Sequence, residues 1–277
     1  MKLEELKLLT YDIRSDIVEM IGRAESGHPG SSLSMVELVT ALFFEIMELR
    51  PDEPDWPERD RFVLSKGHGV PALYSVLARA GYFPLDKLRE LRRLGSPLQG
   101  HPDYSRLPAV EASTGSLGQG LSISAGIALS ACHLDKNFHS FCLLGDGELN
   151  EGQVWEAAAF AAHHKLSNLT AIVDYNKFQL DGPVDEIMQM EPMVDKWQAF
   201  GWEVQEVDGH DLEQVVEALH WTKDSDHLPR CLIAHTIKGK GVSFMENNNK
   251  FHGKAPDQQE LADALAELRK ARQEVAG

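Results

Sequence analysis

The sequence predicts an α/β protein built on a parallel β-sheet with helices on both faces. Two apolar runs, 140–145 and 168–176, have the length and composition of buried strands, and the segment 151–166 between them has the composition of a helix. A second strand–helix–strand series follows over 202–237. Strands that alternate with helices pair in parallel, and the helices cover both faces of the sheet. Because no internal repeat or linker divides the chain, we expect one domain over 1–277.

The N-terminal part is predicted to be mainly helical. Residues 2–25 repeat apolar side chains at helical spacing, and the segment ESGHPGSS then ends the helix. Ser34 and Glu37 have the spacing of a capping box, which predicts a second helix from there to about residue 47. The elements expected next are a Pro-rich acidic loop over 49–60, a strand over 61–66, a helix over 70–81 and a surface helix over 84–94.

Residues 95–120 are rich in Gly, Pro and Ser and are predicted to form a long loop. A loop of this length in a compact domain is usually functional or mobile, so we expect this one to belong to the site. The elements expected after it are a small-residue helix over 117–134, strands over 140–145 and 168–176 separated by a helix over 151–166, strands over 202–208 and 229–237 separated by a helix over 211–223, and a C-terminal helix over 256–277.

Composition and charge exclude several classes of protein. The formal charge is −16, which is unfavourable for general binding to nucleic acid or to an anionic membrane. Three cysteines without a CxxC pair predict reduced thiols in a cytoplasmic protein. The N-terminus mixes charges with apolar residues and is no signal peptide, and no uncharged apolar run approaches the roughly 18 residues that span a bilayer.

The segment LLGDGELNEG places a carboxylate between two glycines at the end of a predicted strand. Asp146 ends one strand and Asn176 ends the next, 30 residues later, so both should project from the same sheet edge. Such oxygen ligands suit Mg²⁺, which completes its shell with phosphate oxygens and water. Gly145 and Gly147 allow a phosphate to come close, and the helix that begins near Glu151 points N–H groups there. The pattern predicts a diphosphate site built through a metal.

Two other interpretations of Gly-Asp-Gly are possible. The segment is also common as a plain turn between a strand and a helix, but the matching Asn176 makes that interpretation less favourable. A dinucleotide site is a poor match because no GxGxxG follows the first strand.

The pattern GDG followed after about thirty residues by Asn resembles the thiamine diphosphate motif. The resemblance implies that Asp146, Asn176 and the main-chain carbonyl of Phe178 bind Mg²⁺, or another divalent cation such as Ca²⁺ or Mn²⁺, and that the metal binds the diphosphate of the cofactor.

Four histidines directly follow a glycine: His28, His68, His101 and His210. Glycine lets the backbone approach a ligand closely, and imidazole can donate, accept or exchange a proton. A single histidine in a loop is usually a surface residue. The first three, however, lie in loops predicted to rim the sheet, which favours a shared site, whereas His210 begins a helix and is interpreted as structural.

Seven segments resemble those of transketolase in sequence and order, from about residue 10 to 257: AESGHPGSSLS, VLSKGHG, LQGHPD, STGSLGQGLS, GDGELNEGQVWEA, DYNKFQLDG and KFHGKAP. The fold implied is the diphosphate-binding domain of thiamine-dependent enzymes. The resemblance implies catalytic roles for His28, His68, His101 and His252. It implies cofactor contacts at His68, Gly115, Leu117, Asp146, Gly147, Asn176 and Glu151, of which Glu151 resembles an acid that links paired active sites. The residues before His252, NNNKF, depart from the common form of their motif.

The resemblance also implies a partner. Transketolase is much longer and contains a pyrimidine-binding domain, which nothing after residue 257 can supply. The chain therefore resembles the N-terminal subunit of a split transketolase, which works in an α2β2 heterotetramer with a separate C-terminal subunit. The implied reaction moves a two-carbon ketol unit from a ketose or ketose phosphate to an aldose or aldose phosphate, as in the pentose phosphate pathway.

Three alternatives remain open at this point. One is a split transketolase for a modified sugar such as a sulfosugar. Another is a subunit of a different thiamine enzyme, of the 2-oxo acid dehydrogenase or deoxyxylulose-phosphate synthase type. The third is a binding protein that has lost the chemistry, which the complete set of Asp, Asn and His residues disfavours.

Overall fold

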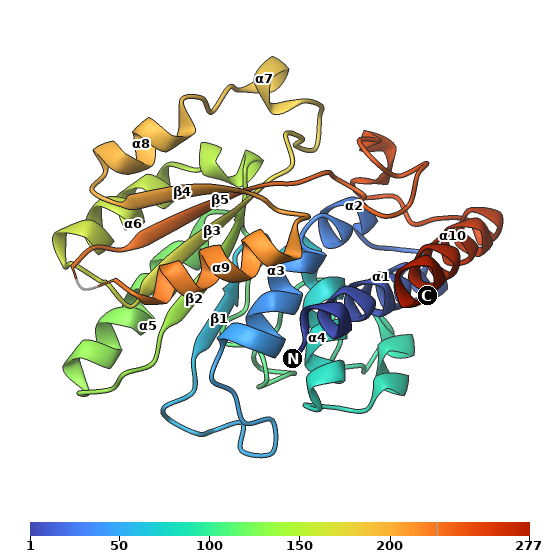
Figure 1. The fold of residues 1–277 in the computed structure, drawn as a ribbon, viewed down its shortest axis with the longest axis horizontal. Coiled ribbons are helices and arrows are strands. Elements are labelled where there is room, and N and C mark those ends of the chain that lie inside the picture. Colours follow the sequence, from blue (N-terminus) through green and yellow to red (C-terminus); the bar gives the residue numbers. More distant parts are fainter. Residues whose placement is uncertain (226) are drawn as a thin grey trace.

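The computed structural model describes residues 1–225 and 227–277 and contains a five-stranded parallel sheet (Figure 1). The strands lie in the order β1-β2-β3-β5-β4, and every neighbouring pair is parallel. The predicted fold class is therefore confirmed. The strands are β1 (Arg61–Leu64), β2 (Ser140–Gly145), β3 (Leu169–Tyr175), β4 (Glu203–Asp208) and β5 (Arg230–His235).

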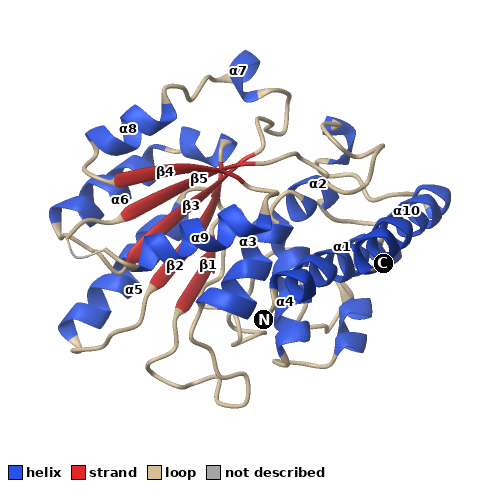
Figure 2. Cartoon of the chain, in the orientation of Figure 1, coloured by secondary structure: helices blue, strands red, loops and turns tan. Residues whose placement is uncertain are grey.

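Helices cover both faces of the sheet. In Figure 2 the strands lie side by side in the centre of the view with helices on either side of them. The helices are α1 (Leu3–Ala24), α2 (Pro29–Leu33), α3 (Val36–Ala41), α4 (Val70–Ala80), α5 (Gln119–His133), α6 (Gly152–His163), α7 (Val184–Ile187), α8 (Met193–Ala199), α9 (Leu212–Lys223) and α10 (Gln258–Ala276).

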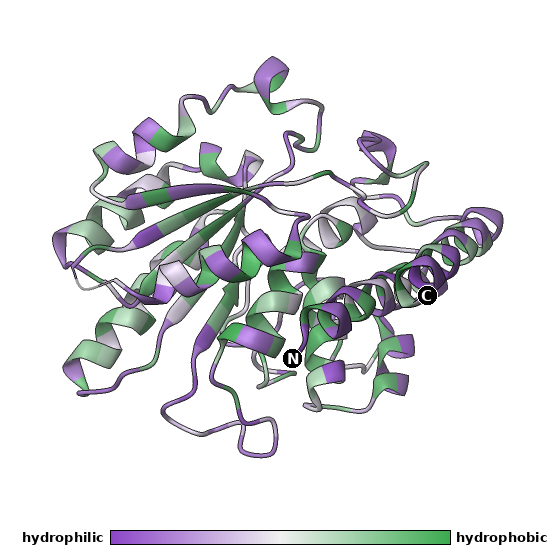
Figure 3. Ribbon diagram, in the orientation of Figure 1, coloured by the Kyte–Doolittle hydropathy of each residue, from purple (hydrophilic) through white to green (hydrophobic). Residues whose placement is uncertain are grey.

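The core consists of two hydrophobic clusters, one on each face. Alternate residues of β2 belong to different clusters: Phe141 and Leu143 pack with α1, α3, α4 and α9, whereas Cys142 and Leu144 pack with α5, α6 and α8. Successive side chains of a strand point to opposite faces. A strand with a cluster on each face is expected to be apolar, which explains why β2 was predicted with its observed bounds. The central strands are largely hydrophobic in Figure 3, whereas the edge strand β4 is mostly hydrophilic.

The capping box predicted at Ser34 and Glu37 is wrong. The structure has two short helices here, α2 and α3, and the N-cap residue of α3 makes no side-chain hydrogen bond. The Ser34 hydroxyl donates instead to Asp174 at 2.6 Å, and Glu37 forms a buried ion pair with Arg14. Both side chains bind partners from distant parts of the chain, which sequence spacing cannot reveal.

The surface helix predicted over 84–94 is also wrong in its length and type. A 3₁₀ helix spans Leu85–Glu90, and the chain then turns. Arg92 has a left-handed φ of 59°, and its N–H donates to the carbonyl of Leu98 at 2.8 Å, which folds the segment back on itself. The short helices α7 and α8 were not predicted.

The remaining predicted elements are confirmed within a few residues, including the loop at 95–120, which contains no helix or strand before α5 begins at Gln119. Within the described ranges all three cysteines are free, and no helix is long and apolar enough to cross a bilayer.

Since all strands are parallel, their carboxyl ends share one edge of the sheet, in the direction of α2 in Figure 2. This edge carries the candidate site.

Candidate active site

A cavity of about 420 Å³ lies at the carboxyl edge of the sheet, and every predicted site residue lines it. The structure thus brings together residues from the start, middle and end of the chain, although their chemical roles remain predictions. These residues are His28, His68, His101, Gly115, Leu117, Asp146, Gly147, Glu151, Asn176, Phe178 and His252.

Asp146 and Asn176 follow β2 and β3, which pair in register up to their carboxyl ends. Both side chains are buried. The carboxylate of Asp146 accepts hydrogen bonds from the backbone N–H groups of Gly147, at 2.8 Å, and Lys177. Each carboxylate oxygen keeps a further lone pair, so these bonds orient the group without exhausting its capacity to bind a cation.

A tight turn positions Phe178 beside this pair. The Asn176 side chain accepts from the N–H of Phe178 and donates to Asp174, each at 3.1 Å. Phe178 also forms an antiparallel bridge with Pro183, which closes the turn. Next to Asp146, a Cβ on Gly147 would lie 2.9 Å from the Cβ of Gln179. Only glycine fits there without displacing the turn.

The electrostatics of Asp146 fit a cation site. Burial, together with the nearby charge of Asp174, raises the pKa of Asp146 to about 7. A divalent cation in contact with the carboxylate would offset both effects and favour the ionised form. Among the described residues no group of three or more His, Cys, Asp or Glu is arranged to bind a metal. The donor set therefore suits a hard ion held by one carboxylate, amide and carbonyl oxygens and a ligand's phosphates.

The four predicted histidines form one cluster. The ring centroid of His28 lies 5.2 Å from that of His68, 6.3 Å from His101 and 5.7 Å from His252. His68 accepts or donates a hydrogen bond at Ser31 Oγ, 3.0 Å away. The buried Nδ1 of His28 has no hydrogen-bond partner within the described part of the chain. Since buried polar atoms are normally paired, this nitrogen is available to a ligand.

Burial and nearby positive charges keep these rings neutral. Burial lowers the pKa of His28 to about 4 and that of His252 to about 3, and Arg92 and Lys238, respectively, add to the effect. The pKa of His68 is lowered by burial and Lys66, and that of His101 by burial and Arg92. Neutral imidazoles can accept as well as donate hydrogen bonds.

The loop at 95–120 contributes His101, Gly115 and Leu117 to the cavity wall. Gly115 has a φ of 142°, and a Cβ there would lie 3.0 Å from the ring of His101. Thr114 anchors this stretch by donating from its hydroxyl to the carbonyl of Leu64 at 2.7 Å. The loop therefore joins the end of β1 to the histidine cluster.

Two buried lysines belong to the site and were not predicted. Lys66 forms an ion pair with Asp174 and donates to the carbonyl of Ser31 at 2.8 Å. Lys238 donates to Nδ1 of His252 at 2.7 Å, and burial lowers the pKa of Lys238 to about 8. One indication was visible in the SKGHG turn, where Lys66 lies two residues before His68.

The two acids after the Gly-Asp-Gly segment have different surroundings. Glu148 is buried and accepts hydrogen bonds from Ser65 Oγ and from the N–H groups of Gly118, at 2.9 Å, and Gly145, at 3.0 Å. It thereby connects three of the segments that line the cavity and was also not predicted. Glu151 lines the cavity and is exposed, and its role between subunits remains a prediction.

His210 lies outside the cavity, as predicted. Its Nδ1 is 3.1 Å from the carboxylate of Glu37, and its Nε2 accepts from the N–H of Ile237 at 2.8 Å.

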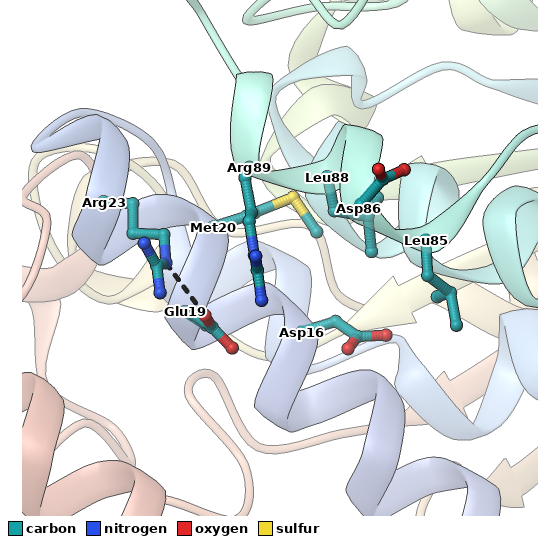
Figure 4. A pocket seen from close by; sticks show the side chains of 8 residues that line it. All are labelled: Asp16, Glu19, Met20, Arg23, Leu85, Asp86, Leu88 and Arg89. Carbon is teal, nitrogen blue, oxygen red and sulfur yellow. Dashed lines mark hydrogen bonds and ion pairs between the residues drawn. The ribbon is translucent and has the colours of Figure 1, made fainter.

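A separate hollow of about 220 Å³ lies between α1 and the 3₁₀ helix Leu85–Glu90 (Figure 4). Glu19 and Arg23 in its wall pair with each other at 2.8 Å, and none of the predicted site residues lies there.

Comparisons with known proteins agree with this geometry. The family model described as the thiamine diphosphate binding domain of transketolase matches residues 7–272. The chain is 46% identical to the 6-deoxy-6-sulfo-D-fructose transketolase subunit SqwG of Clostridium sp. (strain MSTE9) over 93% of its own length and 94% of that protein. It is 40% identical to one of the subunits of apulose-4-phosphate transketolase from Phocaeicola vulgatus, over 97% of this chain and 95% of the relative.

The chain also resembles part of longer transketolases. It is 42% identical to human transketolase, of which it covers 40%. The crystal structure of transketolase from Campylobacter jejuni superposes on this chain with a TM-score of 0.91 at 31% sequence identity. The superposition includes 99% of this chain but only 46% of the longer protein.

The parallel sheet and the family match define a thiamine diphosphate-binding α/β protein of the transferase class. The chain belongs to the transketolase family, in which it corresponds to the N-terminal, thiamine diphosphate-binding part.

Proposed function

We propose that this chain is the cofactor-binding subunit of a split transketolase, which transfers a two-carbon ketol unit from a ketose to an aldose. The observation that carries the proposal is that four histidines line the same cavity as Asp146 and Asn176. The match over nearly the full length of two transketolase subunits supports the split arrangement. Residues 1–277 act as one thiamine diphosphate- and metal-binding domain.

In this proposal Asp146, Asn176 and the carbonyl of Phe178 bind Mg²⁺, and the metal with Gly147 and His68 holds the diphosphate. Thiamine diphosphate, when bound, supplies the nucleophilic carbon that carries the ketol unit. Lys66 and Lys238 provide positive charge at the site of a protein whose overall charge is −16. Local cations rather than net charge therefore attract the anionic cofactor.

The histidines would handle protons and substrate hydroxyls. His28, His101 and His252 are neutral at physiological pH, so each can accept a proton from a hydroxyl and return it. The rings of His101 and His252 lie within 6.3 Å of the His28 ring, and His28 Nδ1 has no protein partner among the described residues. Gly115 and Leu117 would contact the aminopyrimidine part of the cofactor.

A separate C-terminal subunit would complete the site, with an α2β2 assembly in which Glu151 faces the paired centre. Exposed apolar side chains beside the cavity support such a partner: Leu180 lines the cavity, and Ile187 and Met188 lie on the same segment. The free cysteines fit the reducing conditions of the cytoplasm.

A specific observation favours a modified sugar as a second candidate substrate. The two relatives matched over nearly their whole length are named for 6-deoxy-6-sulfo-D-fructose and apulose 4-phosphate, whereas the chain covers only 40% of human transketolase. In this version the reaction type is the same, and the donor is a sulfosugar or a branched-sugar phosphate rather than a pentose phosphate pathway intermediate.

The test is a coupled ketol-transfer assay with thiamine diphosphate and Mg²⁺. The chain is assayed alone and with a candidate C-terminal subunit, such as the product of an adjacent reading frame. The donors are xylulose 5-phosphate, 6-deoxy-6-sulfo-fructose and apulose 4-phosphate, with ribose 5-phosphate and glyceraldehyde 3-phosphate as acceptors. We expect turnover only in the mixture, and the preferred donor identifies the substrate class. Full turnover by the chain alone would contradict the split arrangement.

Two variants make the assay specific. His101→Ala should lose most turnover and keep the affinity for the cofactor. The matched control is His163→Ala on the exposed surface of α6, which should behave as the unmodified protein. Equal losses in both variants would show that the effect does not come from the cavity.

A further inference from the structure

The segment 99–101, which carries His101 into the cavity, is not itself part of a helix or strand. It lies within the long loop before α5. Side chains from other elements hold its three carbonyl groups instead. The Tyr74 hydroxyl lies 3.0 Å from the carbonyl oxygen of Gln99 and 3.3 Å from that of His101. Between them, Arg92 donates to the carbonyl of Gly100 at 3.4 Å.

Tyr74 is well placed to fix this segment. Its side chain is fully buried in the core cluster, on the α4 helix that begins directly after the Gly67–Gly69 turn. That turn contains His68, so α4 links the positions of His68 and His101 rigidly. Burial raises the pKa of Tyr74, which means that the hydroxyl keeps its proton and acts as a donor to the two carbonyls.

The peptide groups around Gly100 need such a donor. Glycine has wide conformational freedom, and this one lies directly before His101. The Gln99 carbonyl belongs to the peptide before Gly100, and the His101 carbonyl belongs to the peptide after His101, so a hydroxyl that bonds both limits rotation of the backbone between them. The His101 ring then rests over Gly115, where even a Cβ would come within 3.0 Å. A small rotation near Gly100 would move the ring out of this contact and away from His28.

We propose that Tyr74 is a positioning residue that holds His101 in its reactive place through the carbonyls of Gln99 and His101. This inference rests on the proposed function for its effect on turnover, but not for its effect on the loop. Tyr74 does not touch the cavity itself. It acts through another residue, and its loss should therefore reduce turnover without weakening the binding of the cofactor.

The variant Tyr74→Phe removes a single oxygen and keeps the ring in the core. The matched control is Tyr82→Phe, because Tyr82 packs against the same cluster and its hydroxyl has no hydrogen-bond partner within the described part of the chain. Melting curves check that both variants are folded. Hydrogen–deuterium exchange of the peptide that covers 99–103 then reports the loop directly, in the chain itself and without any substrate.

We expect faster exchange at 99–103 in Tyr74→Phe and no change in Tyr82→Phe. In the complex with the partner subunit, kcat should fall by about 10- to 100-fold, as for a catalytic group displaced by about 1 Å, with the affinity for thiamine diphosphate unchanged within about twofold. In a His101→Ala background, Tyr74→Phe should cause no further loss, because its target is gone.

Two results would overturn the proposal. One is unchanged exchange at 99–103 in Tyr74→Phe. The other is a loss of kcat that recurs in full in the His101→Ala background, which would indicate a general structural effect. If the unmodified complex transfers no ketol unit, the proposed function fails, and the exchange measurement still decides whether Tyr74 holds the segment.

Discussion

Lys66 and Asp174 form a buried ion pair beneath the cavity, and its removal should strongly destabilise the protein. The side chains are 1% and 0% exposed. Burial alone would raise the pKa of Asp174, but Lys66 and the hydroxyl donors around the carboxylate hold that pKa below its usual value. The variant Lys66→Met keeps the aliphatic stem and removes the charge. It leaves the carboxylate buried with only its neutral donors Ser34, Asn176 and Thr236.

The expected magnitude follows from burial. Removing one partner of a buried pair costs about 3–5 kcal/mol, because the other charge remains unpaired. This is a large part of the 5–15 kcal/mol by which domains are usually stable. The control is Lys87→Met, which removes a surface pair with Glu90 at 3.0 Å and 48% and 37% exposure. An exposed pair of this kind contributes less than about 1 kcal/mol.

Urea denaturation followed by circular dichroism measures both free energies of unfolding. Asp174→Asn and the double variant Lys66→Met/Asp174→Asn complete a thermodynamic cycle. The double variant leaves no unpaired charge. Its loss of unfolding free energy should therefore be smaller than the sum of the two single losses by at least about 2 kcal/mol. If the losses of unfolding free energy in the two single variants simply add in the double variant, the two buried charges do not compensate each other and the reasoning is wrong. Equal losses in Lys66→Met and Lys87→Met would also refute it.

Three further outcomes are expected. Asp146→Asn keeps the shape but not the charge, so Mg²⁺-dependent affinity for thiamine diphosphate, measured by calorimetry on the complex, should fall more than about 100-fold; retained affinity would exclude Asp146 as a ligand. Gly115→Ala places a Cβ against His101 at a φ of 142° and should cost about 1–3 kcal/mol in unfolding free energy, whereas Gly126→Ala, on α5 with open space around it, should be neutral or stabilising. Glu148→Gln puts an amide where a carboxylate accepts three hydrogen bonds and should cost about 1–3 kcal/mol; an unchanged melting temperature would show that the three donors find other partners.

The sheet and the cavity could be predicted because their signals are local. A strand buried on both faces must be apolar along its whole length, as 140–145 is, and a side chain that follows a parallel strand must lie at the edge where the ligand binds. Asp146 and Asn176 each follow such a parallel strand, although the strand before Asn176 also contains the buried polar residues Thr170 and Asp174. The glycine–histidine turns could be grouped because glycine next to a functional side chain is visible in the sequence itself.

The network under the cavity could not be predicted, because its residues are charged or polar and look like surface residues in the sequence. Lys66 and Asp174 are 108 positions apart, and Ser34 lies 140 positions from the same carboxylate. Such pairings depend on the completed fold. The false capping box at Ser34 has the same origin, since the hydroxyl that fits a local cap binds a distant partner instead.

The chain as a whole is negatively charged, but the fixed charges that act on the histidines of the cavity are mainly cations. In a protein with a formal charge of −16, excess negative charge would raise the pKa of a histidine. In the cavity, burial is the largest cause and lowers the pKa of His28 and His252, and the positive charges of Arg92, Lys66 and Lys238 lower it further. Burial disfavours charge of either sign, so only the smaller contribution of the cations distinguishes an anion from a cation here. Arg92, Lys66 and Lys238 add to burial in keeping the rings neutral, and the same three cations would attract a diphosphate. The binding of the anionic cofactor and the supply of neutral bases therefore share these cations, whereas burial contributes only to the second.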